Sequence, residues 1–139
     1  MADIVPFPVE LTERHVVLVV DDEPVIRTVL SEFLRDCGLH SVAVESGDEA
    51  FRLLRLGVAI DIVFSDVRMP GDVDGYGLAR WIMENRPEIP VILVTGDLGK
   101  ANAAIELCGA EVLAKPYEFD AAVKTIRKTL KRRHAATTG

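Results

Sequence analysis

The feature that most constrains the fold is a regular alternation between short apolar runs and amphipathic stretches. A continuously apolar run, typical of a strand buried on both faces of a parallel sheet, occurs at 16–20, and 90–94 repeats this pattern. Further strands are expected at 60–64 and 111–114, with a weaker one at 41–44. Between them, residue types and spacing favour helices from Pro24 to Gly38, from the capping box at 46–49 to Gly57, and over 75–85, 101–107 and 119–131. This order predicts an α/β protein.

The number of βα units further narrows the topology. Five units joined by right-handed crossovers fit a flavodoxin-like, doubly wound five-stranded parallel sheet of order 2-1-3-4-5, with helices on both faces. In such a sheet, ligands bind outside the carboxyl ends of the strands. We expect one domain over 15–131, preceded by an N-terminal extension over 1–14 and followed by a short basic and polar tail over 132–139.

Composition and charge exclude several classes of protein. A net charge of −6 argues against binding nucleic acid through the whole surface, because phosphate backbones need a basic face. No apolar stretch approaches the roughly 20 residues that span a bilayer, and Met1–Pro6 is unlike a secretory signal. Cys37 and Cys108 are far apart and suggest neither a disulfide framework nor a zinc site. We therefore expect a cytoplasmic protein without membrane contact.

Carboxylates follow two of the predicted strands. Asp21 and Asp22 come directly after the first strand, and Asp66 comes just after the third. These strands are neighbours in the expected order, so the three acids should converge, although solvated loop acids are an alternative. Two unit charges about 4 Å apart repel by roughly 4 kcal/mol near a protein surface. Such a cluster needs a counter-ion, and oxygen ligands in an open loop favour Mg²⁺.

Two more polar residues follow strands at the same edge. Thr95 comes after the fourth predicted strand and Lys115 after the fifth. Together with the acids they supply a carboxylate nucleophile, a metal site, a hydroxyl donor and a fixed cation. Phosphoryl transfer requires positioning and charge neutralisation of this kind.

Four segments carry a family resemblance that spans roughly residues 15–131. Residues 17–24 (VLVVDDEP), 61–70 (DIVFSDVRMP), 91–95 (VILVT) and 112–116 (VLAKP) occur in order and at suitable spacing. They resemble the receiver domain of two-component response regulators, in its stand-alone, chemotaxis-regulator-like form. Four segments in register are far more specific than any one of them.

The resemblance implies a role for each matching residue. Asp66 resembles the phosphoacceptor, Thr95 the hydroxyl that bonds the phosphoryl oxygen, and Lys115 the cation that pairs with Asp66 or its phosphate. Mg²⁺ would be held by Asp21, Asp22, Asp66 and the Arg68 main-chain carbonyl. The implied donor is a phosphohistidine on a histidine kinase or a histidine phosphotransfer protein, and the Lys115–Pro116 bond is expected to be cis.

The sequence also departs from the family pattern. Val112 occupies a position that is usually aromatic, and the loop between Pro70 and Gly75 is one residue longer than usual. Arg68 and Asp97, two residues past Asp66 and Thr95, are placed to form an ion pair that slows hydrolysis.

The implied function is a phosphorylatable signalling switch that changes its affinity for a downstream partner and catalyses only its own phosphorylation and dephosphorylation. Alternatives are a phosphoryl shuttle or sink, the receiver piece of a longer regulator, a degenerate scaffold, or, from a different class, an aspartate-nucleophile phosphatase. The sequence does not identify the partners or the oligomeric state.

Overall fold

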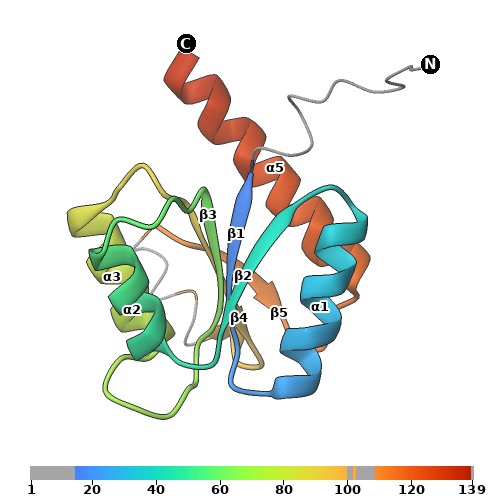
Figure 1. Cartoon of the computed structure of the whole chain (residues 1–139), viewed down its shortest axis with the longest axis vertical. Coiled ribbons are helices and arrows are strands. Elements are labelled where there is room, and N and C mark those ends of the chain that lie inside the picture. Colours follow the sequence, from blue (N-terminus) through green and yellow to red (C-terminus); the bar gives the residue numbers. More distant parts are fainter. Residues whose placement is uncertain (1–14, 100–101, 103–108, 139) are drawn as a thin grey trace.

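The computed structural model describes residues 15–99, 102 and 109–138, and within them a parallel sheet lies between two layers of helices (Figure 1). The strand order is β2-β1-β3-β4-β5, as predicted, and every neighbouring pair is parallel. The strands are β1 (Val16–Val20), β2 (His40–Val44), β3 (Ile62–Asp66), β4 (Val91–Thr95) and β5 (Glu111–Ala114).

The helices cover both faces of the sheet. They are α1 (Pro24–Asp36), α2 (Gly47–Arg55), α3 (Gly75–Asn85) and α5 (Phe119–Thr138). Figure 1 shows α2 and α3 on one face and α1 and α5 on the other, so the core has two halves. Leu18, Val63 and Leu93 point into the first half, while Val19, Ile62 and Ile92 point into the second. This alternation explains why β1 is apolar throughout and β4 is apolar up to its last residue.

Several element boundaries differ from the sequence prediction. Strand β3 runs two residues later than predicted and β4 one residue later, because polar side chains at a strand end do not interrupt backbone pairing: Asp66 still pairs with Val94, and Thr95 with Ala114. Before β3, the Asp61 carboxylate accepts a hydrogen bond from Val16 N at 2.7 Å. As a result, Asp66 and Thr95 are the last residues of their strands rather than loop residues that follow them.

Helix α5 is longer than predicted, and the capping of α2 differs in one bond from the predicted capping box. Helix α5 continues past Lys131 to Thr138, and it is held by side-chain contacts of Arg132 with Glu111 and of Arg133 with Asp61. At α2, Ser46 Oγ accepts a hydrogen bond from Glu49 N as predicted. The Glu49 carboxylate bonds Glu45 N, one residue before the expected partner of a capping box.

The predicted helix at 101–107 lies, apart from residue 102, outside the described residues, as does the extension over 1–14. None of the described helices has the length and apolarity that crossing a bilayer would require.

Candidate functional site

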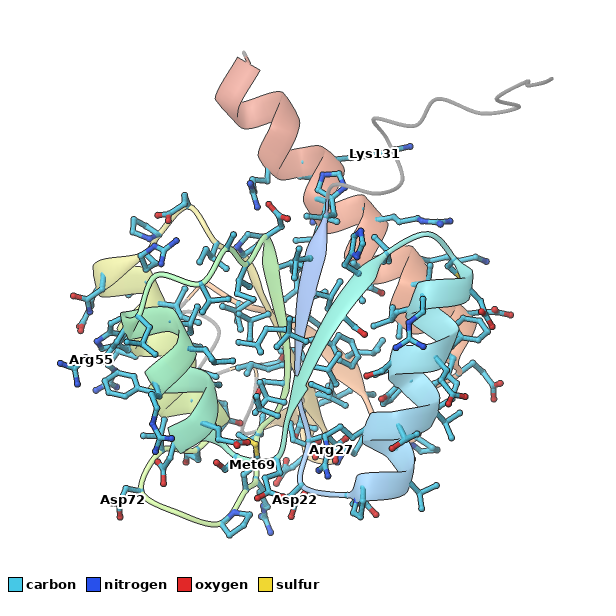
Figure 2. The ribbon with its side chains drawn as sticks, viewed as in Figure 1. Asp22, Arg27, Arg55, Met69, Asp72 and Lys131 are labelled. Atoms are coloured by element: carbon cyan, nitrogen blue, oxygen red, sulfur yellow. The ribbon has the colours of Figure 1, made fainter. Side chains whose placement is uncertain are left out.

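Three carboxylates meet at the carboxyl ends of β1 and β3. One carboxylate oxygen from each of Asp21, Asp22 and Asp66 lies within 4.8 Å of the others. The adjacency of β1 and β3 brings them together, as the sequence predicted. Asp21 and Asp66 are buried, whereas Asp22 is exposed. Figure 2 shows Asp22 at this end of the sheet.

The backbone around Asp21 fixes its direction. Asp21 N donates to Val44 O at 3.2 Å, and Asp21 Oδ1 accepts from Glu23 N at 2.8 Å as the chain turns into α1. Arg27, one turn into α1, donates from its guanidinium to Asp21 O at 2.8 Å. Arg27 is a supporting residue that sequence reasoning missed, because nothing in its spacing distinguishes it from other surface arginines on helices.

Lys115 is the cation at the centre of the site. Its Nζ lies 2.5 Å from Asp66 Oδ1, and its backbone N donates to Thr95 O at 2.8 Å, directly after β5. The Lys115–Pro116 peptide bond is cis, as expected. The structure therefore brings Asp66, Thr95 and Lys115 to one edge of the sheet.

Thr95 and its neighbours form a small hollow beside Lys115. A cavity of about 320 Å³ is lined by Val67, Arg68, Val94, Thr95, Gly96, Asp97 and Lys115. Thr95 Oγ1 accepts a hydrogen bond from Asp97 N at 3.0 Å, so its hydroxyl hydrogen is not used in that bond. Arg68 and Asp97, the two variable neighbours singled out from the sequence, thus border the same cavity.

Burial and charge determine the proton affinity of the site. Burial raises the pKa of the Asp66 carboxyl to about 6, and the negative charge of Asp21 adds to the effect, while the Lys115 ammonium opposes it. For Lys115, burial lowers the pKa, but the hydrogen bond to Asp66 and its charge outweigh burial, so the pKa lies above the ordinary value. Both groups are therefore charged at neutral pH.

Tyr117 lies close to this edge but points into the core. Its ring packs edge-on against Phe64 of β3, with centroids 5.7 Å apart, and also contacts Phe119. Burial raises the pKa of the phenol to about 12, helped by the charges of Asp21, Asp66 and Glu23. Tyr117 is thus a packing residue near the acids.

The residues present fit a hard divalent cation. Three carboxylates offer oxygen atoms within one small volume, and within the described part of the chain one ammonium, that of Lys115, is paired with them. The raised pKa of Asp66 means that its ionised form lacks sufficient compensation in the metal-free protein. Oxygen donors and excess negative charge are what Mg²⁺ sites in proteins provide.

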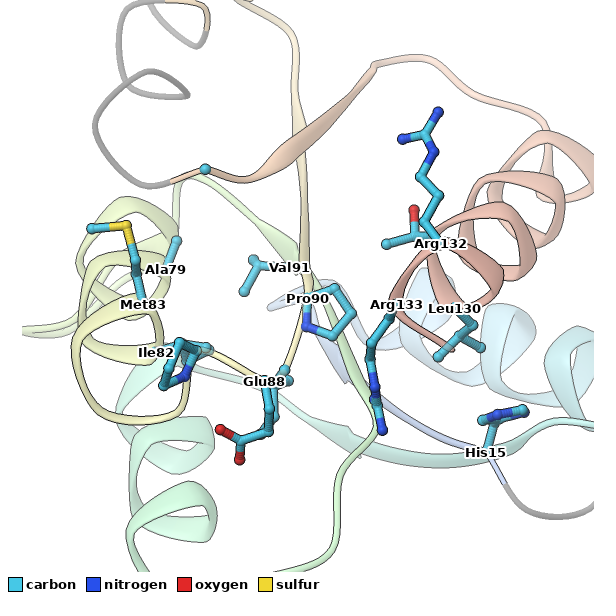
Figure 3. Close-up of a pocket in the computed structure, with 14 residues that line it drawn as sticks. His15, Ala79, Ile82, Met83, Glu88, Pro90, Val91, Leu130, Arg132 and Arg133 are labelled. Carbon is cyan, nitrogen blue, oxygen red and sulfur yellow. The ribbon is translucent and has the colours of Figure 1, made fainter. Parts of the chain in front are cut away.

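A larger pocket lies at the opposite end of the sheet. Its volume is about 840 Å³, and its lining includes His15, Pro90 and Gly109, which stand before β1, β4 and β5. Figure 3 shows Pro90 and Val91 between Ile82 of α3 and Leu130 of α5. None of the residues predicted to carry chemistry lines this pocket.

Comparison with known proteins identifies the family. The family model of the response regulator receiver domain matches residues 17–127, which is most of the chain. The chain belongs to the response regulator receiver family. It is therefore a domain of two-component signal transduction, as the sequence motifs indicated.

Curated relatives and solved structures agree with this assignment. The transcriptional regulator NtrC of Salmonella typhimurium is 36% identical over 120 residues, which cover 85% of this chain and 25% of NtrC. The C4-dicarboxylate transport regulator DctD of Rhizobium meliloti is 35% identical over 84% of this chain and 25% of its own length. The chain thus spans about a quarter of the length of these relatives.

Two of the structural neighbours are receiver domains of similar size. A receiver protein from Sinorhizobium medicae has a TM-score of 0.78 and 28% identity, covering 86% of this chain and 96% of its own. A CheY-like receiver domain from Methanospirillum hungatei has a TM-score of 0.81 over 88% of this chain and 98% of its own; at 21% identity it supports the fold alone.

Proposed function

We propose that this receiver domain accepts a phosphoryl group on Asp66 from a phosphohistidine of a histidine kinase or a histidine phosphotransfer protein. The observation that carries the proposal is the buried Asp66 carboxylate, held between Lys115 Nζ at 2.5 Å and the acids Asp21 and Asp22. An Asp66 oxygen attacks phosphorus, the phosphorus–nitrogen bond breaks, and the released imidazole takes a proton.

Each neighbour of Asp66 has a role that follows from its position. Asp21, Asp22, Asp66 and the Arg68 carbonyl would hold Mg²⁺, which supplies charge neutralisation for the transferring group. Lys115 neutralises one phosphoryl oxygen. Thr95, whose hydroxyl hydrogen is not used in its bond with Asp97 N, donates to another.

The output of the switch is a change in affinity for a downstream protein. Thr95 lies at the end of β4, and Gly96 and Asp97 after it are exposed, so reorientation of its hydroxyl changes the surface directly. Val112 offers no aromatic ring to amplify that movement. A shuttle or sink would instead return the phosphoryl group to a phosphotransfer protein.

Labelling with a small phosphodonor tests the proposal. With acetyl phosphate and Mg²⁺, the intact protein should gain the mass of one phosphoryl group, and neither the Asp66→Asn variant nor EDTA-treated protein should gain it. Continuous turnover of a phosphate ester such as p-nitrophenyl phosphate would instead indicate the phosphatase alternative. That chemistry needs an acid two residues after the nucleophile, where this chain has Arg68.

A further inference from the structure

The loop between β3 and α3 is bound to the start of α2 by one carboxylate. Asp48 Oδ1 accepts a hydrogen bond from Val73 N at 3.0 Å, and Asp48 Oδ2 accepts one from Asp72 N at 3.3 Å. These partners lie 24 and 25 residues along the chain from Asp48. Figure 2 shows Asp72 at the outer edge of this loop. One side chain therefore satisfies two consecutive amides of a loop that is otherwise exposed at its tip.

Two glycines make this contact sterically feasible. Gly71 has a φ of +104°, and a Cβ at this position would lie 2.7 Å from Asp48 Oδ2. A Cβ on Gly47, the first residue of α2, would lie 2.1 Å from Val73 O. The backbone of the loop thus reaches α2 only because neither position carries a side chain.

The base of the same loop is fixed separately at the end of β3. Gly75 N donates to Val67 O at 2.8 Å, and Val67 N donates to Val94 O at 3.1 Å. Arg68 lies between this base and the tip at Gly71. On the other side of Arg68, the Asp48 carboxylate therefore holds the loop through polar contacts, and Met69 and Val73 hold it by packing on the core.

A carboxylate suits this position for electrostatic reasons. Asp48 is the second residue of α2, where the positive end of the helix dipole stabilises an anion. Amide donors bound to a charged acceptor make stronger hydrogen bonds than those bound to a neutral one. The loop is also one residue longer than is usual in the family, so it has more conformations to restrict.

We propose that Asp48 is a positioning residue for the metal site, because it holds the loop that carries the Arg68 carbonyl. This inference rests on the proposed function, in which that carbonyl is a Mg²⁺ ligand. Asp48 does not touch the ion; it limits how far Arg68 moves away from Asp21, Asp22 and Asp66.

The test compares Asp48→Ala and Asp48→Asn with Asp120→Ala. Asp120 is a matched control, because it is also the second residue of its helix, α5, and is exposed. Mg²⁺ binding is measured by isothermal titration calorimetry. Loss of a residue that hydrogen-bonds a metal ligand weakens metal binding about 10–100-fold. Asp48 acts one step further from the ion, so its replacement should raise the Mg²⁺ dissociation constant ~3–10-fold. Asp120→Ala should leave it unchanged.

A second readout detects the hydrogen bonds of the Asp48 carboxylate to the loop in the absence of metal. In Asp48→Ala the amides of Asp72 and Val73 should exchange with solvent about tenfold faster than in the wild type, because each loses its acceptor. Asp48→Asn keeps the size of the side chain and one acceptor oxygen, and it should shift both readouts in the same direction as Asp48→Ala. It therefore serves as the test variant if the alanine variant folds poorly. At saturating Mg²⁺, phosphorylation should recover to within about twofold of the wild-type rate.

The outcomes separate this inference from the proposed function. Wild-type protein that does not bind Mg²⁺ would overturn the proposed function and this inference together. Normal Mg²⁺ binding by the wild type with equally tight binding by Asp48→Ala and Asp48→Asn would overturn this inference alone, even if the two amides exchange faster. Equal weakening by Asp120→Ala would attribute the effect to net charge and would also overturn it.

Discussion

Lys115 Nζ lies 2.5 Å from Asp66 Oδ1, and the two side chains differ greatly in exposure: 38% of the lysine side chain and 3% of the aspartate side chain are accessible. The carboxylate is thus buried while its counter-charge stays in contact with water. This asymmetry leaves Asp66 incompletely compensated, and burial raises its pKa to about 6.

The raised pKa predicts a pH-dependent effect of Asp66→Asn on stability. The ordinary pKa is 3.8, so folded protein binds this proton more tightly than unfolded protein does. The stabilisation that this proton contributes to the folded state is fully present below about pH 4 and is lost as the pH rises through about 6. In EDTA, the unfolding free energy of the asparagine variant relative to that of the wild type should be about 1–2 kcal/mol higher at pH 8 than at pH 5. Urea unfolding at both values measures this, and a constant difference would contradict it.

Replacing Thr95 should separate phosphorylation from its readout. Thr95→Ala removes the acceptor of Asp97 N and the proposed donor to the phosphoryl group. We expect Asp66 still to be labelled, but the NMR shift changes of the Gly96 and Asp97 amides on labelling should become much smaller. Thr95→Ser should restore them, because it keeps the hydroxyl. Wild-type shift changes in the alanine variant would show that another group reads the phosphoryl group.

Arg68 and Asp97 should control the lifetime of the phosphoryl group. Both line the cavity that contains Thr95 and Lys115. An ion pair across this cavity would restrict attack by water. An exposed pair contributes about 0–1 kcal/mol, so Arg68→Ala or Asp97→Ala should speed dephosphorylation by up to about fivefold. The decay of labelled protein after removal of the donor measures the rate; unchanged lifetimes in both variants would refute the role.

Gly75 should not tolerate a side chain. A Cβ there would lie 2.3 Å from Asp66 O and 2.7 Å from Val67 Cα, and both are backbone atoms. Gly75→Ala should therefore cost more than about 3 kcal/mol of unfolding free energy. Gly96→Ala is the control, since its Cβ would meet no atom of the described residues within 4 Å, and it should change stability by less than about 0.5 kcal/mol. Equal effects of the two substitutions in urea unfolding would contradict the steric explanation.

The strand-end chemistry could be predicted from sequence because it depends on local patterns. Runs such as Val16–Val20 identify buried parallel strands, and their carboxyl ends share one edge of the sheet. Asp21, Asp22 and Asp66 therefore had to be close once the strand order was known, and the structure places them within 4.8 Å.

Contacts between distant segments could not be predicted in this way. The Asp48 carboxylate belongs by sequence to a helix start, and its bonds to Asp72 and Val73 depend on how α2 packs beside the loop. The apolar periodicity of α5 ends near Leu130, but Arg132 and Arg133 extend the helix through contacts with Glu111 and Asp61. Tertiary contacts of this kind outweigh local propensity.

The most direct test of Asp66 as the acceptor is fluorine NMR of the protein with beryllofluoride and Mg²⁺. Beryllofluoride bound to a carboxylate mimics the phosphoryl group and needs no partner kinase. Wild-type protein should give fluorine resonances of a bound adduct that disappear with EDTA, and Asp66→Asn should give none. The same bound resonances in Asp66→Asn would contradict the assignment of Asp66 as the phosphoacceptor.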